Sequence, residues 1–350
     1  MISERLLAIV RCPECRGVLA STGNRLFCGT CAVTYSRSAD YADLRPKAAF
    51  AEQTKYLDEA LHGDARHERV SPPLLGAGVR NDMLRALLDP QAGDRILDLG
   101  CGSGRALIWN RASGAWTVGV DITPHFAAEA LAGADLLLGD LRRLPFADGA
   151  FNKAYSLDVV EHLSRDALAA MLKEAARVLQ PGGALFVYSH VRRNSRLALA
   201  LRAINRTARW LERIGLIDLT QERLRKSDHV NPLADVADLE ETVAAAGFRI
   251  GQIRYYTPII GALIENILIR VAERAWIAAV KTRPAKRNAS SADTAESTPA
   301  REARLGAKAR LARGGPMYAS LRVLTWAMHL DLVLFGRVRS GPFFALLRRA

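Results

Sequence analysis

The sequence predicts an α/β protein with a doubly wound, mostly parallel sheet, a small N-terminal cysteine module and helical insertions. Two observations carry this prediction. Short apolar segments alternate with helical segments between residues 79 and 256, which is typical of a parallel sheet covered by helices on both faces. Four of the five cysteines lie within the first 31 residues, in two close pairs. A chain of 350 residues is long enough to bury the core of such a sheet.

The N-terminal module, residues 1–46, places its cysteines as two C-x2-C pairs separated by twelve residues. The four residues are Cys12, Cys15, Cys28 and Cys31. Two such pairs close a tetrahedral all-thiolate site, which suits a structural Zn²⁺ because no coordination position stays open. Reduced, unliganded thiols are the alternative interpretation. Cysteines used in this way favour a reducing, cytoplasmic compartment.

The residues around these cysteines extend the pattern. The stretch Leu6–Pro13 and the segment from Tyr35 to Pro46 resemble the zinc ribbon of the small activator subunit of tRNA and translation-factor methyltransferases. Such ribbons occur as partners of methyltransferases or fused to them. The family's "dGIP" stretch is degenerate here, at residues 38–43. The resemblance therefore implies a structural zinc and leaves open whether the ribbon recruits a partner.

A linker over 47–78 leads into the central domain, which opens on the segment 95–104. Its sequence RILDLGCGSG predicts a strand running into a glycine turn that starts a helix, where the backbone can approach a ligand closely. Further strands are expected at 118–121, 136–140, 154–157 and 184–189, with a helix over 167–179. Asp121 ends the strand expected at 118–121 and Asp140 ends the one expected at 136–140, at the edge where ligands bind in such sheets.

This run resembles class I S-adenosylmethionine-dependent methyltransferases of the UbiE/UbiG-like, type 11 group. The matching stretches are ILDLGCGSG, VGVDIT, GDLRRLPFADGAFNKAYSLDVVEHL and VLQPGGALFVYSH. The resemblance implies a seven-stranded Rossmann-like sheet and S-adenosylmethionine as cofactor. By the same resemblance, the cofactor-binding residues are Asp98, Gly100, Gly102 and Gly104 at the methionine part, Asp121 at the ribose, and Asp140 and Leu141 at the adenine. Asn152 replaces the family's usual Asp.

Methyl transfer requires an acceptor aligned behind the methyl group, and an O or N acceptor also profits from a base. Three residues near the expected cofactor crevice are candidates: Glu161 and His162 after the fourth strand, and His190 at the end of the fifth. For His162, orientation of the following helix is an equal alternative. The sequence does not decide whether a second metal assists.

The net charge of +13 is concentrated in two segments. Residues 192–226 hold ten basic and three acidic residues, and residues 281–313 hold nine and three. Within a lid expected over 191–232, four arginines recur along one helix face: Arg202, Arg206, Arg209 and Arg213. This face suits anionic lipid headgroups or nucleic-acid phosphates, or is an ordinary solvated face.

Residues 257–340 are expected to be a helical insertion before the last strand, at 341–350. Residues 259–278 are amphipathic, residues 281–313 have a composition typical of a disordered linker, and residues 317–336 are apolar nearly all round. The last pattern predicts a helix buried against protein or at a bilayer surface. No window of about 18 uncharged apolar residues predicts a transmembrane helix, and no secretory signal is apparent.

These observations predict a methyltransferase acting on an O or N acceptor, less readily on C. The favoured acceptor is a lipid-like, lipid-linked or glycan small molecule, met in the cytoplasm at the inner face of the membrane. One alternative is methylation of RNA or a translation factor, motivated by the ribbon and the charge. Another is a non-catalytic scaffold that binds the cofactor, motivated by Asn152. The acceptor atom and the oligomeric state stay open.

Overall fold

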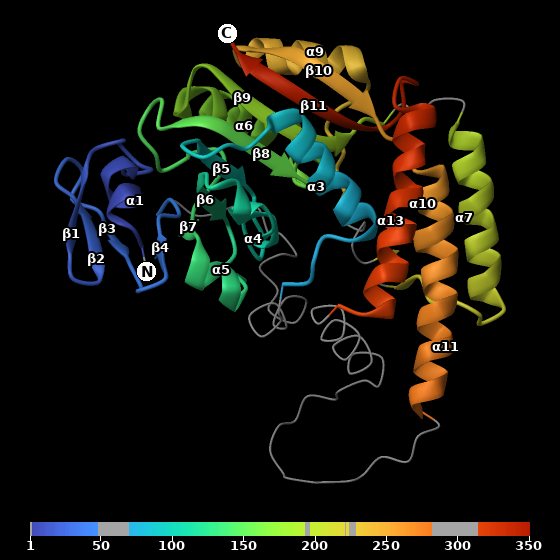
Figure 1. The fold of residues 1–350 in the computed structure, drawn as a ribbon. Helices are drawn as coiled ribbons and strands as arrows, with labels where there is room; N and C mark the ends of the chain where they lie inside the picture. Colours follow the sequence, from blue (N-terminus) through green and yellow to red (C-terminus); the bar gives the residue numbers. More distant parts are fainter. Residues whose placement is uncertain (1, 48–69, 193–196, 221, 224–228, 282–313) are drawn as a thin grey trace, which may run out of the picture.

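The computed structural model describes residues 2–47, 70–192, 197–220, 222–223, 229–281 and 314–350. Most of the linker expected over 47–78, and nearly all of the linker expected over 281–313, lie outside the described residues. Figure 1 shows the N-terminal module at one edge of a large sheet and a group of long helices at the opposite end.

The N-terminal module combines a short helix with a three-stranded antiparallel sheet. Ser3 caps helix α1, Glu4–Ile9, by accepting a hydrogen bond from the amide of Leu6 at 3.1 Å. The strands are β1 (Leu19–Thr22), β2 (Arg25–Cys28) and β3 (Thr34–Ser36), in the order β1-β2-β3. A fourth short strand, β4 (Tyr41–Asp43), leaves this sheet and pairs in parallel with the main one.

The main sheet has eight strands in the order β10-β11-β9-β8-β5-β6-β7-β4. The expected count of seven was wrong, because β4 of the N-terminal module adds a strand beside β7. The parallel strands of the core are β5 (Arg95–Leu99), β6 (Trp116–Asp121), β7 (Asp135–Leu138), β8 (Phe151–Leu157) and β9 (Leu179–His190). Strand β11 (Pro342–Arg349) lies antiparallel between β9 and β10 (Phe248–Tyr255).

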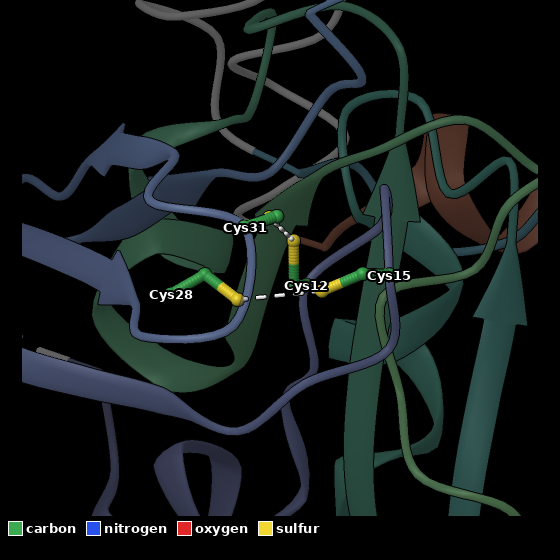
Figure 2. A group of neighbouring side chains, drawn as sticks. All are labelled: Cys12, Cys15, Cys28 and Cys31. Carbon is green, nitrogen blue, oxygen red and sulfur yellow. Dashed lines mark hydrogen bonds between the residues drawn. The ribbon is translucent and has the colours of Figure 1, made fainter.

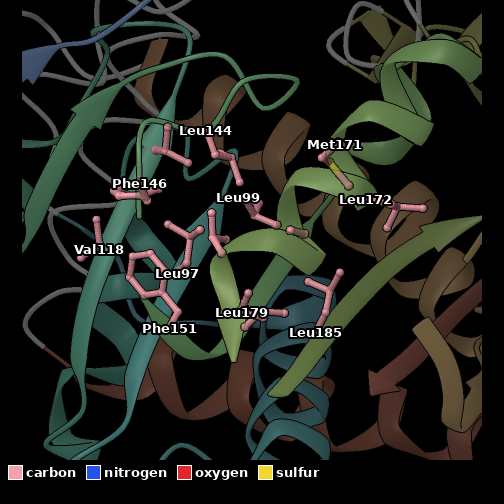
Figure 3. Close-up of a cluster of buried hydrophobic side chains, with 14 of the residues drawn as sticks. Leu97, Leu99, Val118, Leu144, Phe146, Phe151, Met171, Leu172, Leu179 and Leu185 are labelled. Carbon is pink, nitrogen blue, oxygen red and sulfur yellow. The ribbon is translucent and has the colours of Figure 1, made fainter. Parts of the chain in front are cut away.

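Helices cover both faces of the sheet, and alternate residues of each strand pack against them. Leu97 and Leu99 of β5 join one buried cluster with α6 (Arg165–Val178) and α9 (Val236–Ala245). Figure 3 shows part of this cluster, in which Phe146 packs edge-on against Phe151. Ile96 faces the other way, into a cluster with α3 (Leu75–Leu88), α4 (Arg105–Asn110) and α5 (Ala128–Gly133). The sheet is therefore doubly wound, as predicted.

Helix α3 begins at Leu75, inside the linker expected over 47–78. Gly76 and Gly78 lower helix propensity and hid this first turn. The structure shows why Gly78 is there: a Cβ at this position would lie 2.7 Å from Cγ2 of Thr325. Close packing against a distant helix, which local propensity does not report, explains the difference.

The remaining helices form a separate layer. They are α7 (Ala198–Arg213), α10 (Ile259–Leu263), η5 (Ile264–Leu268), α11 (Ile269–Lys281) and α13 (Pro316–Phe335). In Figure 1, α13, α10 and α7 stand side by side beyond the amino end of α3. None of the described helices is long and apolar enough to span a bilayer.

Helix α13 is only partly buried within the described protein. Residues 317–336 were expected to be buried against protein or at a bilayer surface, and against protein only Thr325, Met328 and Asp331 of this helix are buried. Several of its large apolar residues face outward; Trp326 is 68% exposed and Val333 is 79% exposed. Apolar composition alone does not orient a helix, because the few polar contacts described below fix which side faces the protein.

Candidate active site

A pocket of about 550 Å³ opens at the carboxyl ends of β5, β6, β7 and β8. This is the edge at which parallel α/β sheets bind their ligands, and the volume lies within the usual range of small-molecule sites. His162 lines it, and so do six of the predicted cofactor residues: Asp98, Gly100, Gly102, Asp121, Asp140 and Leu141. The fold therefore brings these residues together around one cavity.

The glycine turn after β5 brings the backbone to the wall of this pocket. Gly100 has φ +78° and a Cβ there would lie 2.5 Å from Cγ2 of Val159, so no other residue fits without rearrangement. Gly102 has φ +53° and open space where a Cβ would stand. Gly104 lies outside the lining: a Cβ there would meet Ala130 of α5 at 2.6 Å, so its contact is helix packing.

Asp98 is the most buried charged group of the pocket wall. Burial, reinforced by the nearby Asp121 carboxylate, raises the pKa of Asp98 to about 8. Its Oδ2 atom has no hydrogen-bond partner among the described residues. A buried carboxylate with an unused acceptor atom is suited to a cation, and the α-ammonium group of S-adenosylmethionine fits that requirement.

Asp121 ends β6 and turns its carboxylate toward the glycine turn. Oδ2 accepts a hydrogen bond from the amide of Gly102 at 2.7 Å, and Oδ1 accepts from the amide and hydroxyl of Thr123, both at 2.9 Å. These donors hold the side chain at the pocket wall, where a ribose hydroxyl can donate to it. Asp140 follows β7 and forms an ion pair with Arg142 at 3.0 Å, beside Leu141.

Another part of the lining, called the second compartment below, comes from α3, α4 and the segment after β8. Arg80 of α3 forms an ion pair with Asp158 at 3.2 Å and lies over the ring of Tyr188, 5.4 Å from its centroid. Trp109 of α4 and His162 complete this side. The pocket thus joins a carboxylate-lined compartment to one with an arginine, an indole and an imidazole.

Sequence reasoning missed Arg80, Trp109 and Asp158. Asp158 lies inside a quoted motif, three residues before Glu161, and its position at the end of β8 could have indicated it. Arg80 and Trp109 lie on helices whose pocket-facing positions have no sequence signature. Tertiary packing alone brings them to the cavity.

The other two catalytic candidates lie behind this wall. Glu161 is buried and accepts a hydrogen bond from the Ser189 hydroxyl at 3.0 Å; burial raises its pKa to about 7. The rings of His162 and His190 both adjoin His229, at centroid distances of 4.7 Å and 5.4 Å. Neither Glu161 nor His190 lines the pocket among the residues described.

His229 was not expected at this site and comes from the lid segment. The carbonyl of Glu161 accepts hydrogen bonds from the amides of Val230 and Asn231, at 2.8 and 3.0 Å, and these bonds hold the segment in place. One ligand atom each from Glu161, His162 and His229 lies within 4.8 Å of the others. These three side chains could hold a divalent ion as well as relay a proton.

The four N-terminal cysteines form a compact cluster at the other end of the sheet, shown in Figure 2. The Sγ atoms of Cys12 and Cys31 lie 3.6 Å apart, and those of Cys15 and Cys28 lie 3.4 Å apart. All four sulfurs lie within 4.8 Å of one another. Zn–S bonds of about 2.3 Å in a tetrahedron put sulfurs roughly 3.8 Å apart, so the donor set fits a zinc ion.

Asn152 stands at the amino end of β8, remote from the pocket edge. Its Oδ1 accepts a hydrogen bond from the amide of Arg95 at 2.7 Å, and its Nδ2 donates to Asp94 at 2.6 Å. The residue therefore joins the starts of two neighbouring strands. Replacement of the family's Asp at this position changes a structural contact and leaves the pocket untouched.

Comparison with known proteins agrees with this geometry. Residues 97–187 match a family model described as a methyltransferase domain. Three curated relatives are similar to the chain. They are the methyltransferase GfsG of Streptomyces halstedii (30% identity, 47% of this chain, 66% of the relative), the probable tRNA methyltransferase 9B of Mus musculus (36%, 29%, 23%) and the demethylmenaquinone methyltransferase of Mycolicibacterium vanbaalenii (38%, 40%, 63%).

The chain thus spans less than two thirds of the length of each of these relatives. The family match covers the strands and turns that build the pocket. Residues 97–187 thus match a methyltransferase domain, and they lie in a doubly wound sheet.

Proposed function

We propose that this protein is an S-adenosylmethionine-dependent methyltransferase that transfers a methyl group to an O or N acceptor. The observation that carries the proposal is a single pocket that joins Asp98 and Asp121 to the compartment of Arg80, Asp158 and His162. S-adenosylmethionine, when bound, supplies a methyl group on a sulfonium whose leaving group is a neutral thioether. The protein's task is therefore mostly alignment and exclusion of water.

Each part of this task can be assigned to particular residues of the pocket. Asp98 would hold the cofactor's ammonium group and Asp121 its ribose hydroxyls, with Asp140 and Leu141 at the adenine. The Arg80–Asp158 ion pair would orient the acceptor, because the pair holds both side chains in place. His162 would take the proton that an O or N acceptor loses, with His229 beside its ring.

For the acceptor, we favour a lipid-like or lipid-linked molecule at an anionic membrane surface. The four predicted arginines of α7 are all exposed, and Trp210, 57% exposed, lies among them. An arginine face with an interfacial tryptophan suits lipid headgroups. The name of the demethylmenaquinone methyltransferase relative points to a lipid-like acceptor for that protein.

RNA is the second candidate. The resemblance of residues 5–46 to the ribbon of tRNA-methyltransferase activators, and the name of the probable tRNA methyltransferase relative, favour it. The α7 arginines would then contact phosphates. The third alternative, a scaffold without activity, is no longer supported by Asn152, since this residue lies away from the pocket.

We also propose that the four cysteines bind a structural zinc. The donor set is complete without water, so this ion would not take part in methyl transfer.

The deciding experiment is incubation of the protein with methyl-labelled S-adenosylmethionine and cell extract, followed by fractionation into lipid, glycan, RNA and protein. Label in the lipid fraction supports the favoured proposal, and label in RNA supports the second candidate. Asp98→Asn should abolish most of the transfer, and Asn152→Asp, a matched change away from the pocket, should not. Absence of label in every fraction would contradict the proposed activity.

A further inference from the structure

Helix α13 buries one side and exposes apolar residues on the other. The buried side contains Thr325, Met328 and Asp331, and Leu324 and Leu332 pack against the same core. The exposed stripe runs from Val323 toward the end of the helix and continues past it: Val323 (64% exposed), Trp326 (68%), Leu330 (37%), Val333 (79%), Leu334 (60%) and Val338 (41%). A surface helix of a soluble protein usually has polar residues on its outer side, so this stripe indicates a contact with something apolar.

The polar contacts prevent the helix from turning its stripe inward. The Thr325 hydroxyl accepts a hydrogen bond from the amide of Leu75 at 2.7 Å. The Asp331 carboxylate accepts from the amides of Ile260 and Gly261, at 2.9 and 2.8 Å. Rotation of α13 would leave these amides unpaired in the interior. The stripe is therefore a fixed surface of the folded chain.

Charge distinguishes between the surfaces that could cover this stripe. Arg322, Arg337 and Arg339 are exposed at its two ends, and the only acidic residue between 316 and 339 is the buried Asp331. A second copy packed antiparallel on the stripe would bring these arginines together without an acidic partner. An anionic bilayer instead offers hydrocarbon for the stripe, phosphates for the arginines and an interfacial level for Trp326.

We propose that the α13 stripe is the surface by which the protein lies on an anionic phospholipid bilayer. The same helix holds the first turn of α3, through Thr325, and that turn leads to Ala77 and Arg80 in the wall of the second compartment. Docking through α13 thus sets the acceptor side of the pocket at a fixed distance from the membrane. This inference deepens the proposed function and rests on it for the lipid-like nature of the acceptor.

The test is co-sedimentation of the full chain with vesicles of phosphatidylcholine alone or mixed with phosphatidylglycerol. The double variant Trp326→Ser/Val333→Ser removes the centre of the stripe. A matched control, Phe27→Ser/Val18→Ser, changes two exposed apolar residues of the N-terminal module. We expect the unmodified chain and the control to bind mixed vesicles, and the stripe variant to bind on the order of 100-fold more weakly.

Analytical ultracentrifugation of the same variants gives the competing outcomes. A dimer that dissociates only in the stripe variant would assign the stripe to a second copy and overturn the proposal. Equal vesicle binding by the stripe variant and the unmodified chain would overturn it as well. Vesicle binding involves no methyl transfer, so a chain that binds vesicles but labels no acceptor contradicts the proposed function while leaving the docking surface in place.

Discussion

The N-terminal module and the helical layer are both additions to the same sheet, and they expose different surfaces. The module buries its apolar residues with those of the core: Leu6, Val10 and Leu44 belong to one cluster with Leu97 and Leu99. The helical layer packs Met328 and Ile264 into the core, adds the polar contacts of Thr325 and Asp331, and leaves a stripe of apolar residues of α13 exposed. The difference indicates that the module completes the fold, whereas the layer presents a surface for a further partner.

Removal of the proposed zinc from the cysteine cluster should have the largest effect on the attachment of the N-terminal module. Structural zinc contributes about 10 kcal/mol to folding in isolated zinc-finger peptides, so its loss should unfold the module. The amides of Arg11 and Leu44, which donate to Pro145 at 2.9 Å and Leu138 at 2.8 Å, should then exchange quickly with solvent.

Hydrogen exchange after chelation measures this, with Cys101→Ser as the control. Cys101 is a buried cysteine outside the cluster, so its substitution should leave both amides protected. Protection that survives chelation would show that the module is held by its core contacts alone.

Asp98→Asn tests the pocket that lies between the two additions. Loss of a charge-assisted hydrogen bond should weaken binding of S-adenosylhomocysteine by about 10- to 100-fold. Because the pKa of Asp98 is about 8 in the empty pocket, binding of an ammonium group below that pH must release a proton. Affinity should therefore rise with pH, by at most about tenfold per unit, and level off near pH 8.

Calorimetry in buffers of different ionisation enthalpy counts the released proton. The Asp98→Asn variant should lose this pH dependence, and Asp40→Asn, on the exposed side of the N-terminal module, should retain it. An identical pH profile for all three proteins would remove Asp98 from the binding site.

Asp331→Asn tests the polar attachment of the helical layer. The amide keeps the size of the carboxylate but offers one acceptor for two backbone donors, Ile260 and Gly261. We expect a loss of about 1–3 kcal/mol in the free energy of unfolding. Urea denaturation measures it, with Asp148→Asn, 77% exposed at its side chain, as the control. A change as small as that of the control would mean that α13 is held by other contacts.

The smallest effect belongs to the ion pair between His329 of α13 and Asp82 of α3, at 3.2 Å. The hydrogen bond to Asp82 raises the pKa of His329, so the contribution is complete below the imidazole's unfolded pKa and is lost as pH rises through the folded value. Both groups are partly exposed, and His329→Gln should cost less than about 1 kcal/mol. Unfolding followed by fluorescence should show no such loss of stability in alkaline buffer. A loss that persists there would be due to changed packing and not to the ion pair.

The sequence was most informative where structure is local. A strand that carries Asp98 and a glycine turn follow one another within ten residues at 95–104, so this part of the pocket wall could be predicted. Strand β4 could not, because three residues gain strand geometry only from the edge of β7. Arg80 and His229 reach the site through packing of distant segments. The orientation of α13 depends on Leu75 and Gly261, which lie far from it in the chain.

The position of β11 has a consequence for the order in which the chain folds during synthesis. Strand β10 pairs with β11 along Phe248–Tyr255, yet β11 starts at Pro342. Until residue 349 has left the ribosome, β10 lacks this neighbour and β9 has an open edge. Closing so long a connection costs only roughly 0.6 kcal/mol more than closing one half as long. The larger consequence is the time before β11 is synthesised. During that time the edge of β9 is unpaired and can associate with other chains.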